Sequence, residues 1–421
     1  MNKPAWRAMV FGLIPFAFAL AEQNASSPPS APAQPSDSYE SRAEELETKR
    51  KRREEKLPPV RESRLERILL QIQERRLLEK SEYGWHGLKP RIGALVTGSG
   101  FAVGPEYRRD DLAGGKLDFR VTTQFSTNLF QLYETELIFP KLADGRVFFS
   151  VAARHRNYPQ MQYYGPGPDS AKSGRSNYRL EDNRFSLSAG TKPIRHVTFG
   201  VGGSLLQVNV GPGTRRQFIS TERSFSPAQA PGIDRQSDFF QGHVFVNVDT
   251  RDNVLGPRSG SRLFADYTWN KDIDLETGSH RRLDLEAQQY LPFLNRRRVI
   301  ALRARSELTW KDRGQFVPFY LQPVLGGSDD LRGFRPFRFH DDNLILFNAE
   351  YRYEIFAGLD MAIFGDAGKV FRSKNDWNLE DLEGVYGIGM RFNARGNVVM
   401  RLDAGFSHEG FQVWLKFTNI F

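Results

Sequence analysis

One segment of the sequence gathers residues that can form strong, directional ion pairs. The segment from Leu325 to Phe339 places Arg332 between a leucine and a Gly-Phe pair, and it carries three phenylalanines. Large apolar side chains are uncommon in loops that face water, so we expect this segment to pack inside the protein. A buried arginine needs a carboxylate partner, and a bidentate guanidinium–carboxylate pair would both stabilise the segment and fix its position.

Two carboxylates are candidate partners for Arg332. Period-two alternation places Asp366 and Gly368 on one face of a strand that we expect to be the inner wall, and Glu350 lies on the preceding strand. Asp366 is the preferred partner, Glu350 is the alternative, and an arginine exposed in a loop is the third possibility. Gly333 would let the backbone approach the wall, where Gly368 leaves room for it.

The sequence carries no sign of enzyme chemistry. Its seven histidines form no HExxH motif, no GxSxG motif occurs, and there are no cysteines for a disulfide or a thiolate metal site. We therefore expect no catalytic residues, no metal site and no cofactor.

The segments that carry these residues are predicted to be β-strands. From about Lys89 onward apolar and polar residues alternate, and the clearest example runs from Asn397 to Phe406. In most of these strands one face carries charged residues and the other carries aromatic and aliphatic residues. A barrel with a polar lumen and a lipid-facing wall requires this arrangement. Mean hydropathy is −0.51, which excludes a helical membrane protein. The prediction is all-β, a transmembrane antiparallel β-barrel of about sixteen strands.

Loop lengths support this barrel. Connections after even-numbered strands are short, whereas long segments such as 211–238 and 311–342 follow odd-numbered strands. Barrels in the outer membrane have short periplasmic turns and longer outer loops, so the pattern predicts which end faces which compartment. The predicted strands include 91–96, 146–156, 178–189 and 262–267.

The sequence before the barrel divides into three parts. Residues 1–21 have a charged start, an apolar run and a small-x-small cleavage pattern, which predicts a signal peptide. Residues 22–60 are a charged linker without apolar periodicity, which predicts disorder. Residues 61–88 predict an amphipathic periplasmic helix that docks on the barrel or binds a partner, and residues 89–421 form the barrel.

The end of the chain carries a pattern that outer-membrane assembly machinery reads in its clients. An amphipathic strand with apolar residues on one face ends in a terminal phenylalanine. The residues of this predicted assembly signal are Phe411, Val413, Leu415, Phe417 and Phe421.

Three motifs together resemble the bacterial surface antigen family, which includes the outer-membrane assembly factors BamA and TamA and the two-partner-secretion transporters. The first motif is the loop Gly326-Gly327…Leu331-Arg332-Gly333-Phe334, and the second is the strand Phe364-x-Asp366-x-Gly368. The third resembles a recurring periplasmic turn of that family. Its residues are Asp249, Arg251, Asp252, Asn253, Pro257 and Gly260.

The resemblance implies a fold, a location and a function. In the family the loop folds into a sixteen-stranded lumen, where its arginine pairs with an acidic residue of the inner wall. The implied location is the bacterial outer membrane, with the N-terminal tail in the periplasm, and the implied function is insertion, assembly or translocation of proteins. The implied partners are outer-membrane lipid, the assembly machinery and unfolded or secreted clients.

The segment before the barrel and the net charge give further expectations about domain content and partners. Residues 22–88 show no βααβ pattern, so we expect a short member of the family without POTRA modules. The alternative function is a passive pore, an adhesin or a surface antigen. The net charge of +9 is spread along the chain without a separate basic domain, so we expect no nucleic-acid binding.

Overall fold

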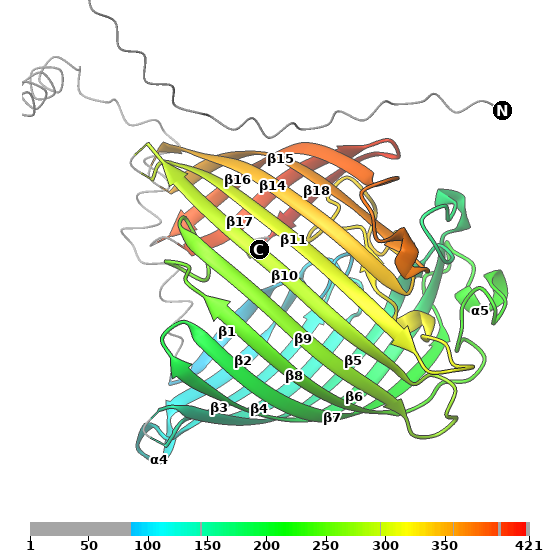
Figure 1. Cartoon of the computed structure of the whole chain (residues 1–421), viewed down its shortest axis with the longest axis horizontal. Helices are drawn as coiled ribbons and strands as arrows, with labels where there is room; N and C mark the ends of the chain where they lie inside the picture. The colour runs from blue at the N-terminus through cyan, green and yellow to red at the C-terminus, as the bar shows by residue number, and fades with distance from the viewer. Residues whose placement is uncertain (1–85, 144, 295, 357, 395–396, 418–421) are drawn as a thin grey trace, which may run out of the picture. The chain divides into compact units, whose positions relative to one another are not determined.

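A single large sheet dominates the structure. The computed structural model describes residues 86–143, 145–294, 296–356, 358–394 and 397–417. Sixteen strands follow one another in sequence order, each antiparallel to its neighbours, and the sheet curls into a nearly closed barrel (Figure 1). The predicted fold class is therefore confirmed. The signal peptide, the linker and nearly all of the amphipathic segment predicted from the sequence lie outside the described residues.

The barrel strands differ widely in length. Their bounds are β1 (Leu88–Gly93), β2 (Ala102–Asp111), β3 (Leu117–Ser126), β4 (Gln131–Leu142), β5 (Val147–Tyr163), β6 (Ser176–Ile194), β7 (Val197–Pro212), β8 (Phe239–Asp249), β9 (Gly260–Asp272), β10 (His280–Phe293), β11 (Arg298–Lys311), β14 (Asn343–Phe356), β15 (Leu359–Phe371), β16 (Glu383–Ala394), β17 (Asn397–Ser407) and β18 (Gly410–Lys416).

The remaining elements are short. A two-stranded sheet, separate from the barrel wall, is formed by β12 (Val324–Leu325) and β13 (Phe339–His340). Short helices occur in the connections, and none among the described residues is long and apolar enough to cross a bilayer. These helices are α4 (Leu112–Gly115), η1 (Lys172–Gly174), α5 (Thr221–Ser224), η2 (Phe319–Leu321) and η3 (Lys374–Asp376).

Several strands begin or end at other residues than the alternation predicted. The first strand lies three residues earlier than the predicted 91–96, and β5 and β6 both extend beyond their predicted ends. These two strands continue as a ladder to the pair Tyr163↔Ser176. Backbone pairing with the neighbouring strand decides where a strand ends, and it continues here through residues whose side chains no longer alternate between lipid and lumen.

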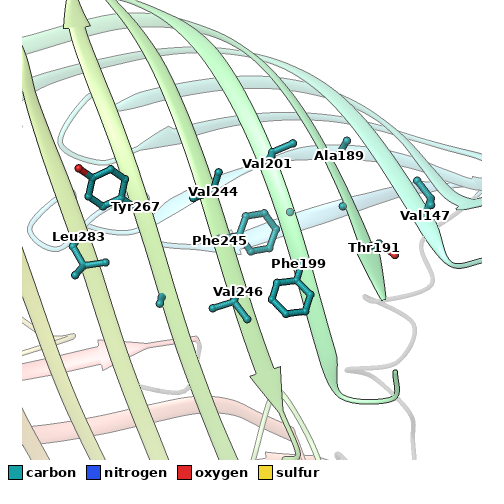
Figure 2. Close-up of a pocket in the computed structure, with 13 residues that line it drawn as sticks. Val147, Ala189, Thr191, Phe199, Val201, Val244, Phe245, Val246, Tyr267 and Leu283 are labelled. Atoms are coloured by element: carbon teal, nitrogen blue, oxygen red, sulfur yellow. The ribbon is translucent and has the colours of Figure 1, made fainter. Parts of the chain in front are cut away.

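The two faces of the wall differ as a membrane barrel requires. Outward side chains such as Ile363, Tyr386 and Phe411 are 64%, 70% and 64% exposed, whereas inward Glu350 and Asp366 are buried. A hollow of about 620 Å³ lies on the outer wall over β5–β10 and is lined almost wholly by apolar atoms. Figure 2 shows the side chains that line it. Among its lining residues are Val147, Ala189, Phe199, Val201, Val244, Tyr267 and Leu283. This exterior suits contact with lipid chains.

The two ends of the barrel are built differently. We call the end with the β4–β5, β6–β7, β10–β11 and β14–β15 connections the short-turn end, and the opposite end, where α5 lies, the long-loop end (Figure 1). The long loops fold together over an apolar cluster with partly buried neighbours. Its buried members are Phe130, Tyr158, Met161, Tyr163, Tyr178, Leu180, Val210, Ala230 and Phe319.

The sheet has two edge strands. β1 and β18 stand at the ends of the strand order, and no ladder joins them among the described residues. One aromatic contact crosses between their neighbourhoods, because the Phe101 and Phe417 rings lie 6.2 Å apart, centroid to centroid, in an edge-to-face arrangement. We call the boundary between β1 and β18 the seam.

Candidate functional site: an inner loop held by an ion-pair network

The segment 326–338, which we call the inner loop, lies inside the protein. The β12–β13 ladder forms its neck through the pairs Val324↔His340 and Leu325↔Phe339. At the start of the loop, Gly326 and Gly327 have φ angles of 110° and 131°, which side-chain-bearing residues rarely adopt. A Cβ on Gly326 would lie 2.5 Å from the carbonyl oxygen of Arg335, so glycine is required for the loop to fold back on itself.

The Arg332 side chain is fully buried and reaches the barrel wall. Its Nε lies 2.9 Å from Asp366 Oδ2 and its Nη2 lies 2.6 Å from Asp366 Oδ1, which is the bidentate fork geometry. Its Nη1 donates to Glu350 Oε1 on the neighbouring strand. The guanidinium carbon lies 3.4 Å from the centroid of the Phe364 ring, so a cation–π contact covers one face of the group.

Asp366 is itself held in place by the wall and the loop. Asn348, its register partner on β14, donates to Asp366 Oδ1 at 2.8 Å and to the carbonyl oxygen of Asp330 at 2.9 Å. The backbone N–H of Arg332 also donates to Asp366 Oδ2 at 3.2 Å. One carboxylate therefore receives the side chain and the main chain of the loop residue, which fixes the orientation of the loop as well as its depth.

Glycines let the loop backbone approach the wall closely. A Cβ on Gly333 would lie 2.9 Å from the backbone of Phe406, and one on Gly405 would lie 2.6 Å from the carbonyl of Arg332. On β15, a Cβ on Gly368 would meet the carbonyl of Ile345 at 2.7 Å and the Leu325 side chain at 3.3 Å. Gly333 and Gly368 thus stand where close approaches leave no space for a side chain.

The ion pairs continue beyond the three residues that the sequence analysis singled out. Glu350 also accepts from Arg391 Nη2 at 2.6 Å and from Arg352 Nε at 2.8 Å. Arg391 in turn donates to Asp403 at 2.5 Å, and Arg401 donates to Asp403 at 2.9 Å. We call this chain of contacts the lumen network. Its members are Arg332, Glu350, Arg352, Asp366, Arg391, Arg401 and Asp403, and all of them are buried.

The lumen network reaches the seam through Asp329 of the inner loop. Arg401 Nη2 lies 2.6 Å from Asp329 Oδ1, and Lys416 Nζ on β18 lies 3.3 Å from Asp329 Oδ2. On the other side of the seam Thr97, which follows β1, contacts Ser328 Oγ at 2.9 Å and donates to Asp329 Oδ2 at 3.2 Å. Residues Ser328 and Asp329 therefore contact both sides of the seam.

The turn between β8 and β9 crosses the short-turn end of the barrel. Asp249 binds Arg251 in a fork with distances of 2.9 and 2.7 Å, and Gly260 has a φ of 97° where a Cβ would lie 2.3 Å from the Thr250 carbonyl. Asp252 accepts the backbone N–H groups of Arg258 and Ser259 at 3.0 and 3.1 Å. These contacts give the turn a defined shape.

The same turn touches distant strands. Asn253 donates to Asn397 on β17 at 2.8 Å, and Arg258 Nη2 lies 2.9 Å from both carboxylate oxygens of Asp360 on β15. The carbonyl oxygen of Pro257 lies 3.5 Å from Nη1 of Arg352, a member of the lumen network. The turn thus contacts the lumen network through Arg352, which is 95 residues away in sequence.

The residues of the predicted assembly signal lie on the last strand. Phe411, Val413 and Leu415 share the outward face of β18 and are 64%, 58% and 54% exposed. Phe417 follows the end of β18, and Phe421 lies outside the described residues. Trp414, on the inward face, donates its indole N–H to the carbonyl oxygen of Arg332 at 2.7 Å.

Comparison with known protein families shows the family of this barrel. A model of the Omp85 superfamily domain matches residues 112–405, a range that spans the inner loop and every member of the lumen network. This chain belongs to the Omp85 superfamily. No curated protein matches it in sequence.

Solved structures share the fold of this Omp85 barrel at low sequence identity. BamA from Haemophilus ducreyi lacking POTRA domains 1–3 is similar with a TM-score of 0.58 and 14% identity, covering 80% of this chain and 70% of that one. CdiB from Escherichia coli is similar with a TM-score of 0.54 and 12% identity, covering 79% of this chain. The chain spans 62% of the length of that CdiB.

Sequence reasoning singled out part of the site in this Omp85 barrel and missed the rest. It named Arg332, Asp366 and Glu350, which the structure brings into contact, but it gave no role to Arg391, Arg401 or Asp403. The sequence did contain a local signal for an ion pair. Arg401 and Asp403 are two residues apart on the polar face of a strand whose opposite face is apolar. Nothing in that spacing indicates that the inner loop lies against the strand.

Proposed function

We propose that this Omp85 barrel assists the insertion, assembly or translocation of proteins at the bacterial outer membrane. The observation that carries the proposal is the seam. Two edge strands, β1 and β18, have no ladder between them among the described residues, and the inner loop contacts both sides. An edge strand presents unpaired backbone N–H and C=O groups, which can template an extended strand of a client.

The lumen network determines where the inner loop sits relative to this seam. Arg332 joins the loop to β14 and β15 through its side chain and to β18 through its carbonyl oxygen, so one residue links the position of the loop to the last strand. Ser407 of β17 adds a hydrogen bond to the Gly333 carbonyl at 2.9 Å. We infer that the loop stays in the lumen and supports the seam while no client is present.

The proposed partners follow from the surfaces of the barrel. Outer-membrane lipid contacts the exposed apolar wall, and the assembly machinery recognises the outward apolar face of β18 when this chain is itself inserted. Clients are unfolded or secreted proteins that present an extended strand. The tail before the barrel extends into the periplasm in this proposal.

Reconstitution tests the function directly. The full-length protein is placed in liposomes, an unfolded barrel protein is added, and its folding is followed by protection from protease. We expect folding to be faster than in empty liposomes and the Arg332→Ala variant to lose most of this acceleration. A rate equal to that of empty liposomes for the unaltered protein would refute the proposal.

The long-loop end favours one alternative function over another. The loops fold over a cluster of buried aromatic residues that includes Tyr163, Tyr178 and Phe319, so this end is a packed surface. Such a surface suits an adhesin or a surface antigen better than a passive pore. Bilayer conductance distinguishes the two, because a pore would conduct and Arg332→Ala would raise its conductance by loosening the inner loop.

A further inference from the structure

Three arginines at the long-loop end are gathered without carboxylate partners. Arg175 immediately precedes β6, Arg215 lies in the β7–β8 connection, and Arg335 belongs to the inner loop; all three are half-buried. We call them the arginine cluster. No aspartate or glutamate of the described ranges forms an ion pair with any of them. The site is separate from the seam and does not depend on the proposed function.

The fully buried arginines of the barrel each have a carboxylate partner. Arg338, the neighbour of the cluster in the inner loop, lies 2.8 Å from Glu409, and the arginines of the lumen network each contact a carboxylate. Burying a guanidinium without a counter-charge costs free energy, which is why buried arginines are normally paired. The arginine cluster therefore lacks the carboxylate partners that the fully buried arginines of the structure have.

The cluster is organised around two aromatic rings. The guanidinium carbons of Arg175 and Arg215 lie 4.0 and 5.4 Å from the centroid of the same Phe218 ring. Arg335 lies near Tyr164, a buried residue whose hydroxyl donates to Gln162 at 2.9 Å. Three chain segments that are far apart in sequence therefore present their cations at one place.

The backbone that carries these side chains is pinned. Asn177, at the start of β6, donates through Nδ2 to the carbonyl oxygens of Arg215 and Phe218 at 3.1 and 3.0 Å. Arg175 is only two residues before Asn177, so the β7–β8 connection and the start of β6 are held together. The arrangement is preorganised, so little conformational entropy would be lost when a ligand binds.

The electrostatics of the cluster call for an anion. Arg175 Nε is buried and has no hydrogen-bond partner among the described residues. Burial lowers the pKa of Arg175, and the nearby charges of Arg335 and Arg215 lower it further. An anion in contact with all three groups would replace this repulsion with attraction and would give the buried N–H an acceptor.

We propose that Arg175, Arg215 and Arg335 bind a phosphate group. Guanidinium forks match phosphate oxygens, and a phosphate monoester carries nearly two negative charges at neutral pH, whereas a carboxylate would neutralise only one of the three cations. The same chemistry is offered by free phosphate and by the phosphorylated headgroup of a membrane glycolipid. Either source would join the β5–β6 connection, the β7–β8 connection and the inner loop.

The test compares phosphate binding by the full-length protein in zwitterionic detergent with binding by two variants. Inorganic phosphate and pyrophosphate are titrated calorimetrically, with chloride at equal ionic strength as the reference. We expect saturable binding that Arg175→Gln and Arg335→Gln each weaken about tenfold or more, because each removes a charge-assisted hydrogen bond. Arg216→Gln is the matched control, since Arg216 is exposed and lies beside the cluster in sequence.

A second arm identifies the source of the phosphate. Phosphatidylcholine vesicles with and without phosphorylated lipid A hold the protein, and the thermal midpoint is measured for each variant. Stabilisation by lipid A that is lost in Arg175→Gln and kept in Arg216→Gln assigns the site to a lipid headgroup, whereas binding of free phosphate alone assigns it to a soluble ligand. The proposal is overturned when neither ligand binds, or when Arg216→Gln weakens binding as much as the cluster variants.

Discussion

The indole N–H of Trp414 donates a hydrogen bond to the carbonyl oxygen of Arg332 at 2.7 Å. Trp414 lies on β18, the last strand of the sheet, whereas the side chain of Arg332 contacts Glu350 on β14 and Asp366 on β15. A single loop residue thus connects β18, one edge of the seam, to strands that stand three and four places away in the strand order.

Removal of either partner of the main ion pair should destabilise the barrel, but by different amounts. Arg332→Ala leaves two carboxylates buried without their common partner, and we expect it to cost about 3–5 kcal/mol. Asp366→Ala should cost less, because Arg332 keeps its contact with Glu350. The thermal midpoint of the heat-resistant folded form in gel electrophoresis measures both. The double variant should be less than additive, and full additivity would show that the two side chains act independently.

Glu350 should be more sensitive to neutralisation than other acidic residues of the lumen wall. Glu350→Gln keeps the shape of the side chain but removes the charge shared by Arg332, Arg352 and Arg391. We expect a loss of about 3 kcal/mol or more in the free energy of unfolding. Glu136→Gln is the control, because Glu136 pairs with one partly exposed arginine and its loss should cost less than about 1 kcal/mol. Equal losses would contradict the importance of the network.

Loss of the Trp414 hydrogen bond should loosen the inner loop without unfolding the barrel. Trp414→Phe keeps an aromatic ring but removes the donor, which should cost about 1 kcal/mol. Trypsin should then cleave after Arg338 more rapidly, and mass spectrometry of the fragments identifies the bond. Trp269→Phe, on the exposed outer face, should leave the cleavage rate unchanged. If the Trp414→Phe variant resists trypsin as well as the unaltered protein does, this hydrogen bond does not hold the inner loop.

A tether between the inner loop and the β1 side of the seam should block the proposed activity. The chain has no cysteine, so Thr97→Cys with Ser328→Cys introduces the only pair, at positions whose hydroxyl oxygens lie 2.9 Å apart. With oxidant, client folding in liposomes should fall to the rate of empty liposomes, and reductant should restore it. Each single cysteine variant is a control. Full activity of the oxidised pair would mean that the loop need not leave the seam.

The architecture could be predicted from the sequence, because apolar and polar residues alternate with a period of two along each strand. The polar face that carries Glu350 and Arg352, and the strand with Asp366 and Gly368, could be assigned to the lumen from sequence alone. The combination of a glycine-rich loop, an arginine and an Asp-x-Gly strand also indicated the family that the Omp85 match establishes. Strand ends were less accurate, since the ladder between β5 and β6 runs on to Tyr163↔Ser176 after the alternation has stopped.

Only the tertiary structure decided which charges meet. Asp329 contacts Arg401, Lys416 and Thr97, which lie 72, 87 and 232 positions away in the sequence. The β8–β9 turn contacts Asn397 across the short-turn end. No local pattern encodes such pairs, because each strand shows only that a residue faces the lumen. Closure of the sheet and the inward path of the loop determine which residues meet there. Burial then makes the ion pairs of the lumen network costly to break.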